Sequence, residues 1–189
     1  MKLLHIDSSI LGDGSASRAL TREIVDRFQV RHPDTAVTYL DLAAQELPHF
    51  SQRSLARTEV RDEQTLGQFL AADVVVIGAP MYNFTIPSQL KAWIDRIAVA
   101  GKTFRYGPKG AEGLVGGKQM IVAVARGSIY PEHAPGEFGE SYLKHLFGFL
   151  GIRDLSFVRA EGLAISPQHR TAALEAARAA IPLPAALAA

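Results

Sequence analysis

The fold is decided by one stretch of the chain, Val74-Val75-Val76-Ile77-Gly78-Ala79-Pro80-Met81-Tyr82-Asn83-Phe84-Thr85-Ile86-Pro87. Residues 73–78 are the most apolar predicted strand, as expected for a strand buried on both faces of a parallel sheet. Residues 88–100 then carry apolar side chains at helical spacing, namely Leu90, Trp93, Ile94 and Ile97. Residues 79–87 are therefore predicted to join the carboxyl end of a strand to a helix, at the edge where open α/β sheets bind ligands.

The composition of this loop favours a planar ligand. It holds Met81, Tyr82 and Phe84 beside Asn83, between two prolines, whereas an ordinary strand-to-helix turn is short and polar. Backbone N–H groups and flat side chains could lie along a heterocycle, and the amide of Asn83 could both donate to and accept from a ring edge. The alternative is a loop whose aromatic residues only cap the core.

A second candidate loop, residues 8–18, lies between a predicted strand at residues 2–7 and a predicted helix at residues 17–30. Helix N-termini attract anions, and the hydroxyls of Ser9, Ser15 and Ser17 can donate to phosphate oxygens. Gly12 and Gly14 are followed by Ser17 where a dinucleotide fingerprint needs a third glycine. The loop therefore favours a phosphate monoester over a pyrophosphate, although serine and glycine are also ordinary capping and turn residues.

The rest of the chain alternates between strand and helix patterns. Further strands are predicted at residues 36–40, 118–125 and 155–160, and further helices at 61–72, at 138–150 and from Ser166 onward. This alternation predicts an α/β fold with a five-stranded parallel sheet in the order 2-1-3-4-5, flanked by helices through right-handed crossovers. Residues 100–117 are predicted to be a glycine-rich excursion, and residues 182–189 a frayed tail.

Bulk composition narrows the function classes. The length of 189 residues, with 48% hydrophobic and 21% charged residues, predicts one soluble domain over residues 1–189. The formal net charge of +1 gives no electrostatic argument for binding nucleic acid or an anionic membrane. Cysteine is absent, and none of the six histidines has metal-ligand spacing, so no metal site is expected. No run is suited to a signal peptide or a membrane span, and a cytoplasmic location is predicted.

Neither a P-loop nor a hydrolase nucleophile motif is present in the sequence. Gly101-Lys102-Thr103 resembles the end of a P-loop, but Arg96 stands where the leading glycine is required and a helix precedes it. The hydrolase motif G-x-S-x-G is absent.

Together, these loops resemble the FMN-dependent NADH:quinone and azobenzene reductases of the flavodoxin-like fold, the azoreductase family. The resemblance runs nearly end to end and is carried by Asp7-Ser8-Ser9, Ser15-Ala16-Ser17-Arg18, Met81-Tyr82-Asn83-Phe84 with Pro87 and Leu90-Lys91-Ala92-Trp93, Gly101-Lys102-Thr103-Phe104-Arg105-Tyr106, and Gly148-Phe149-Leu150-Gly151. It implies a flavodoxin-like three-layer sandwich with non-covalent FMN.

The resemblance also implies roles for single residues. It implies that Ser9, Ser15, Ala16 and Ser17 hold the FMN phosphate, that Met81, Tyr82, Asn83 and Phe84 line the isoalloxazine and ribityl chain, and that Ala125, Arg126, Gly127 and Ser128 approach the pyrimidine edge. Family members often carry a hydroxyl residue where this chain has Ala125. Phe104, Tyr106 and Phe149 fall at positions that shape the substrate pocket, with two active sites at a homodimer interface.

The activity that the resemblance implies is hydride transfer from NADH or NADPH to the flavin, followed by two-electron reduction of a quinone or azo compound in the same place. No catalytic acid or base is then expected from the protein. The alternatives are a non-catalytic flavodoxin that carries single electrons and a flavin-binding sensor. Flavodoxin carriers are usually acidic, and this chain is near neutral.

Overall fold

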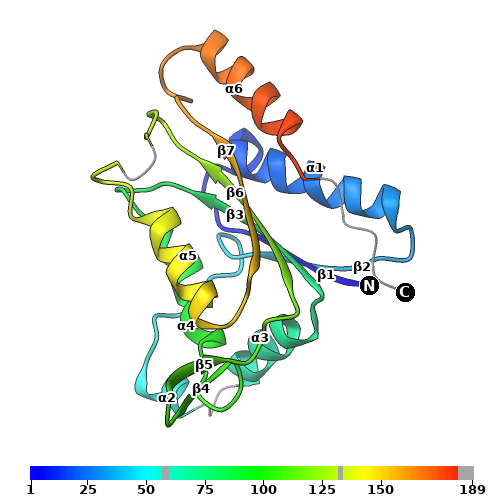
Figure 1. Cartoon of the computed structure of the whole chain (residues 1–189). Helices are drawn as coiled ribbons and strands as arrows, with labels where there is room; N and C mark the ends of the chain where they lie inside the picture. The colour runs from blue at the N-terminus through cyan, green and yellow to red at the C-terminus, as the bar shows by residue number, and fades with distance from the viewer. Residues whose placement is uncertain (57–59, 132–133, 183–189) are drawn as a thin grey trace.

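The computed structural model describes residues 1–56, 60–131 and 134–182. Its central sheet is parallel, with strand order β2-β1-β3-β6-β7 (Figure 1). The strands are β1 (Lys2–Asp7), β2 (Ala36–Asp41), β3 (Val74–Pro80), β6 (Gln119–Ala125) and β7 (Asp154–Ala160). Numbered among themselves along the chain, these five strands have the predicted order 2-1-3-4-5.

Helices cover both faces of the sheet and make three layers (Figure 1). One face carries α1 (Ala16–Arg31) and α6 (Pro167–Ala179), and the other carries α3 (Val60–Ala71), α4 (Ser88–Ile97) and α5 (Gly139–Phe149). A short α2 (Gln52–Leu55) and a 3₁₀ turn, η1 (Gly12–Gly14), complete the helical elements of the described residues. Two separate apolar clusters result because β3 is buried along its whole length and packs on helices from both sides.

The segment predicted as a plain excursion contains an antiparallel hairpin, β4 (Phe104–Gly107) and β5 (Gly110–Gly113). The preceding helix ends at Ile97, short of the predicted Ala100. The cause is Thr103, whose hydroxyl donates to the Ile97 carbonyl at 2.7 Å and accepts from the Val99 N–H at 2.9 Å. Since these bonds satisfy groups at the helix end, they turn the chain into the hairpin.

A backbone crossing anchors the hairpin to the end of α5. A Cβ atom placed on Gly113 would lie 2.2 Å from the nitrogen of Gly151, so only glycine fits there. The Val115 N–H also donates to the Leu150 carbonyl at 3.1 Å. The hairpin therefore lies at the amino edge of the sheet, where β6 and β7 begin (Figure 1).

The opposite, carboxyl edge holds the predicted ligand loops. In the sheet register Asp7 pairs with Gly78, and Pro80 pairs with Ala125. The loops after β1, β3 and β6 therefore begin next to one another at the carboxyl edge of the sheet. Most predicted element ends lie within two residues of those observed, and of the predicted frayed tail, 182–189, residues 183–189 lie outside the described residues. None of the described helices is long and apolar enough to span a bilayer.

Candidate functional site

Buried serine hydroxyls line the loop between β1 and α1. Ser15 is the N-cap of α1, and its Oγ accepts the Arg18 N–H at 3.3 Å and lies 3.1 Å from the Ser17 Oγ. Ser15 is 3% exposed, and Ser9 and Ser17 are 0% exposed. Ala16, the first residue of α1, is also buried. These hydroxyls and the unpaired N–H groups of the first helical turn form a donor set suited to a phosphate group.

An ion pair holds the first half of this loop in place. The Arg18 guanidinium donates to the Ser9 carbonyl at 2.8 and 3.2 Å, and to the two carboxylate oxygens of Asp41 at 2.6 and 2.7 Å. The hydrogen bond from Arg18 holds the pKa of Asp41 below its usual range. Asp41 ends β2, so the edge strand supports the loop through one bidentate pair.

A second carboxylate lies beneath the loop. The buried Asp7 accepts from the Thr21 hydroxyl at 2.8 Å and from the Tyr39 hydroxyl at 3.1 Å. Burial and the Asp7 charge raise the pKa of Tyr39 to about 12. A Cβ atom on Gly78 would lie 2.8 Å from the Asp7 carboxylate, so Gly78 leaves the room that this side chain needs. No sequence pattern assigned a role to Arg18, Asp41 or Tyr39, although Asp41 and Tyr39 stand at positions of β2 that pair with polar residues of β1.

The loop after β3 folds into a tight turn. The Tyr82 N–H donates to the Thr85 carbonyl at 2.9 Å, and the Thr85 N–H donates back at 3.1 Å. Both central residues have positive φ, 49° at Asn83 and 71° at Phe84. This is the dihedral pattern of a type I′ turn, in which a bulky Phe84 is strained. The Phe138 N–H holds the turn by donating to the Phe84 carbonyl at 3.1 Å.

Tyr82 connects the two ligand loops. Its hydroxyl lies 3.2 Å from the Ser9 Oγ and accepts the Ile10 N–H at 3.2 Å. A cavity of about 570 Å³ opens beside this contact, with Ile10, Tyr82, Asn83, Ile86 and Tyr142 among its lining residues. This volume is within the range of small-molecule and cofactor sites, roughly 300–1,000 Å³. The Met81 N–H donates to the Ala125 carbonyl at 2.9 Å, which ties the loop after β6 to this group.

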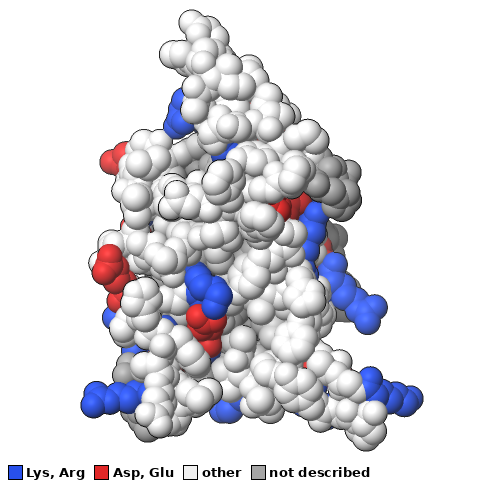
Figure 2. Space-filling view, turned by 90° about the vertical axis from the view of Figure 1, so that its left-hand side faces the viewer, with Lys and Arg blue, Asp and Glu red and all other residues white. Residues whose placement is uncertain are grey.

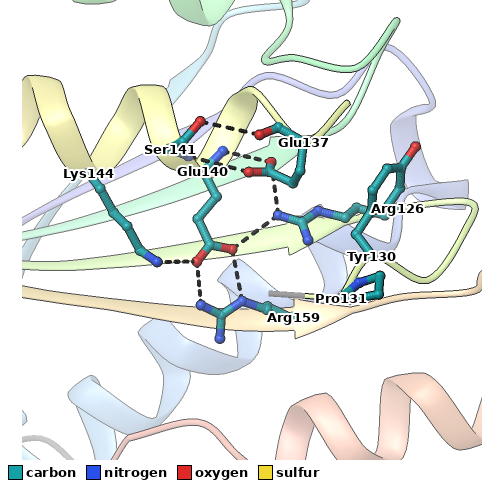
Figure 3. Close-up of a pocket in the computed structure, with 8 residues that line it drawn as sticks. All are labelled: Arg126, Tyr130, Pro131, Glu137, Glu140, Ser141, Lys144 and Arg159. Atoms are coloured by element: carbon teal, nitrogen blue, oxygen red, sulfur yellow. Dashed lines mark hydrogen bonds and ion pairs between the residues drawn. The ribbon is translucent and has the colours of Figure 1, made fainter. Parts of the chain in front are cut away.

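The loop after β6 contains Ala125, Arg126, Gly127 and Ser128, and the Arg126 side chain is engaged in ion pairs. Its guanidinium lies 3.0 Å from Glu137 and 3.0 Å from Glu140 (Figure 3), and it also lies 2.9 Å from Glu161. Burial opposes ionisation of Glu140, but hydrogen bonds from Arg159 and Lys144 lower its pKa to about 2. A cavity of about 490 Å³ borders this charge cluster. Because Arg126 is held by carboxylates, residues 125–128 can offer a ligand their backbone and the exposed Ser128 hydroxyl, but not the Arg126 guanidinium.

The three predicted substrate-pocket residues gather elsewhere. The Phe104 ring centroid lies 4.7 Å from that of Phe149 and 5.6 Å from that of Tyr106. Tyr106 is 76% exposed, although it lies in this aromatic group. The group belongs to the hairpin and the end of α5, at the amino edge of the sheet (Figure 1). Within one copy of the chain, these residues are therefore not brought to the serine loop.

The described residues hold no group of three His, Asp or Glu side chains placed to bind a metal ion. A 2-1-3-4-5 parallel sheet with ligand loops after its first and third strands defines a flavodoxin-like protein, with the loops at the switch point of the strand order.

Comparison with known proteins makes the class more specific. A family described as having the flavodoxin-like fold matches residues 1–182. The chain is 55% identical over 183 residues to the FMN-dependent NADH:quinone oxidoreductase 1 of Xanthomonas euvesicatoria pv. vesicatoria, covering 95% of this chain and 94% of that protein. It is 53% identical over 186 residues to the FMN-dependent NADH:quinone oxidoreductase of Stenotrophomonas maltophilia, covering 96% of this chain and 95% of that one.

Solved structures agree with these relatives. The fold matches an azoreductase from Bacillus anthracis with a TM-score of 0.83 and 31% identity, over 96% of this chain and 99% of that one. It also matches an FMN-dependent NADH-azoreductase from Bacillus anthracis in complex with FMN, with a TM-score of 0.83 and 29% identity, over 95% of this chain and 97% of that one. The chain belongs to the flavodoxin-like family of FMN-dependent NADH:quinone oxidoreductases.

Proposed function

We propose that this chain is an FMN-dependent NADH:quinone oxidoreductase that also reduces azo compounds. The observation that carries the proposal is the buried hydroxyl pair of Ser15 and Ser17 at the start of α1, in a loop that the contact between Ser9 and Tyr82 joins to the loop after β3. A phosphate donor set beside an aromatic loop fits a flavin mononucleotide. FMN, when bound, supplies the hydride-accepting and hydride-donating chemistry.

Three loops bind different parts of the cofactor. The hydroxyls of Ser9, Ser15 and Ser17 donate hydrogen bonds to the phosphate, and Ala16 adds a backbone N–H donor. The ring and the ribityl chain lie along Met81, Tyr82, Asn83 and Phe84. The backbone of residues 125–128 meets the pyrimidine edge, where Ala125 contributes no side-chain hydrogen bond. No side chain acts as a catalytic acid or base, because orientation of donor and acceptor on the flavin is sufficient.

The phosphate assignment has a direct test. Hydrogen bonds to a charged group contribute about 1.5–3 kcal/mol each, so the double variant Ser15→Ala with Ser17→Ala should weaken FMN binding by a few kcal/mol. Titration of the apoprotein by flavin fluorescence measures this. Ser51→Ala removes the N-cap of the remote α2 and is the matched control. Wild-type FMN affinity in the double variant would refute the assignment.

We also propose a homodimer in which the aromatic group of one copy completes the substrate pocket of the other. Phe104, Tyr106 and Phe149 lie at the amino edge of the sheet and the serine loop at the carboxyl edge, so one copy cannot join them. Exposed aromatic side chains such as Tyr106 often mark contacts. Figure 2 shows a face on which most of the surface is uncharged, with one group of opposite charges near its middle and other charged residues toward its edges, which suits contact with a second copy.

Mixing variants tests this arrangement. A copy with Ser15→Ala and Ser17→Ala lacks the phosphate site, and a copy with Tyr106→Ala and Phe149→Ala lacks the aromatic wall. Neither homodimer should turn over efficiently, while a mixture after subunit exchange should recover up to about half of wild-type activity per hybrid dimer, because one site is intact. Absence of recovery in proven hybrids, or a fully active monomer in analytical ultracentrifugation, would refute the proposal.

A single-electron carrier or a flavin-binding sensor is the alternative. Its discriminating assay mixes the FMN-loaded protein with NADH or NADPH and a quinone or an azo dye. Rapid multiple turnover supports the oxidoreductase, and bound flavin without oxidation of the nicotinamide supports the alternatives. A single domain over residues 1–189, a cytoplasmic location, and a lack of nucleic-acid or membrane partners stay predictions. Limited proteolysis and cell fractionation test the first two.

A further inference from the structure

An arginine from the last helix reaches the serine loop from the far end of the chain. Nη2 of Arg170, in α6, donates to the carbonyl oxygen of Gly14 at 2.9 Å. Gly14 ends η1 and immediately precedes Ser15, the N-cap of α1. The packing of α6 beside α1 makes this contact possible, and the bond from Arg27 to the Arg178 carbonyl at 3.0 Å fixes the same pair of helices further along. The Arg170 guanidinium therefore contacts the loop that carries the proposed phosphate-binding hydroxyls, one residue before Ser15.

Arg170 and Arg18, the two arginines at this loop, differ in whether a carboxylate neutralises their charge. Arg18 faces both oxygens of Asp41, so its charge is neutralised locally and its role is to hold the Ser9 carbonyl. Among the residues that the structure describes, Arg170 forms no ion pair, and the Gly14 carbonyl is its hydrogen-bond partner. Asp13, the acid of η1, lies outside ion-pair contact with it. Arg170 is thus the arginine of this loop whose positive charge is available to a ligand.

A phosphate monoester carries a charge of about −1.5 to −2 at neutral pH. Hydroxyls and helix N–H groups provide donors but only partial charge, so they leave most of that charge uncompensated. A cation one residue away from the N-cap supplies a Coulomb attraction that favours the phosphorylated ligand. For a partly exposed cation near a doubly charged anion, this attraction corresponds to about a 3- to 10-fold change in affinity at low salt.

We propose that Arg170 is a cofactor-binding residue that supplies the unpaired positive charge at the phosphate end of the site. It acts through its charge on the phosphate, in addition to its hydrogen bond to the loop. The inference rests on the proposed function, because it needs the serine loop to hold a phosphate.

Two substitutions separate charge from hydrogen bonding. Arg170→Lys keeps the charge, and Arg170→Gln keeps a donor for the Gly14 carbonyl but removes the charge. Apoprotein is titrated with FMN, and with riboflavin as the phosphate-free probe, by quenching of flavin fluorescence. We expect Arg170→Gln to weaken FMN about 3- to 10-fold and Arg170→Lys to change it less than about 2-fold, with riboflavin unchanged in both. Arg153→Gln removes an exposed arginine at the amino edge and is the matched charge control.

Salt dependence gives a second measurement. Raising the ionic strength to about 0.5 M should weaken FMN binding to wild type more than to Arg170→Gln, because screening removes the attraction that the variant has already lost. Asp13→Asn should tighten FMN, since it removes a negative charge from the same loop.

The outcomes distinguish this inference from the proposed function. If wild type binds riboflavin as tightly as FMN, the phosphate site itself is wrong. If wild type prefers FMN and Arg170→Gln keeps the full preference, only the role of Arg170 is refuted. If Arg170→Gln and Arg153→Gln weaken FMN equally, a general charge effect replaces the specific one. If Arg170→Lys weakens FMN as much as Arg170→Gln, the guanidinium acts through its hydrogen bond to the loop and not through its charge, and the charge proposal is refuted.

Discussion

Glu140 offers a test of how the loop after β6 is held. The side chain is 8% exposed, and burial opposes its ionisation, but hydrogen bonds from Arg159 and Lys144 hold its pKa at about 2 against an ordinary 4.5; the carboxylate also contacts Arg126. At ~1.4 kcal/mol for each pH unit, this difference corresponds to about 3 kcal/mol. Lys144 and Arg159 are half-exposed and screened by solvent, so we expect Glu140→Gln to lower the free energy of unfolding by about 2–3 kcal/mol near pH 7.

The pH dependence identifies the origin of the loss. A carboxyl group whose pKa is lowered by folding stabilises the protein above its unfolded pKa, and this contribution disappears as the pH falls through its folded pKa. The difference in the free energy of unfolding between wild type and Glu140→Gln should therefore keep its neutral-pH value down to about pH 5. It should fall by more than half by about pH 2.5. Urea unfolding across this range measures it.

A surface pair is the control for this variant. Glu23→Gln removes one acid from the partly exposed pair with Arg27, and we expect less than about 1 kcal/mol of change. A gap for Glu140→Gln that is the same at both ends of the pH range would show that the loss comes from packing and not from charge. A gap below about 1 kcal/mol near pH 7 would contradict the low pKa.

Three further predictions concern the backbone. Gly113→Ala should displace the hairpin, because its Cβ would meet the Gly151 nitrogen at 2.2 Å; ultracentrifugation should show a weaker dimer, with FMN affinity preserved as the control. Phe84→Gly should raise the unfolding free energy by about 1 kcal/mol by relieving positive φ, and weaken FMN, whereas lower stability would contradict strain in this turn. Thr103→Val should cost about 1–3 kcal/mol in urea unfolding, since it leaves the Val99 N–H without its side-chain partner.

Local patterns were sufficient to predict the sheet and the ligand loops. An apolar run such as residues 73–78 is typical of a strand buried on both faces of a parallel sheet, and Ser15 before an amphipathic helix is a capping signal whatever the tertiary structure. The hairpin at residues 104–113 was missed because its strands are short and rich in glycine, and because it is held by contacts with Leu150 and Gly151, far away in sequence.

Side-chain partners across the fold could not be predicted in the same way. Arg126 stands in a motif that the resemblance assigns to the flavin edge, yet its guanidinium is held by Glu137, Glu140 and Glu161 from two later segments. The contact of Arg170 with Gly14 joins residues 156 positions apart and depends on the packing of two helices. Such pairs follow from the topology of the fold and cannot be predicted from residue spacing along the chain.

Helix α5 has a consequence for communication between sites. It begins next to Phe138, whose N–H holds the strained turn at Phe84, and it ends at Phe149 in the aromatic group. An 11-residue helix is a stiff rod of about 16 Å. A ligand that moves the turn at one edge of the sheet would push on this rod, and the rod would shift the aromatic wall at the other edge. In a dimer with shared pockets, this helix would connect the flavin ring bound by one chain to the substrate pocket of its neighbour.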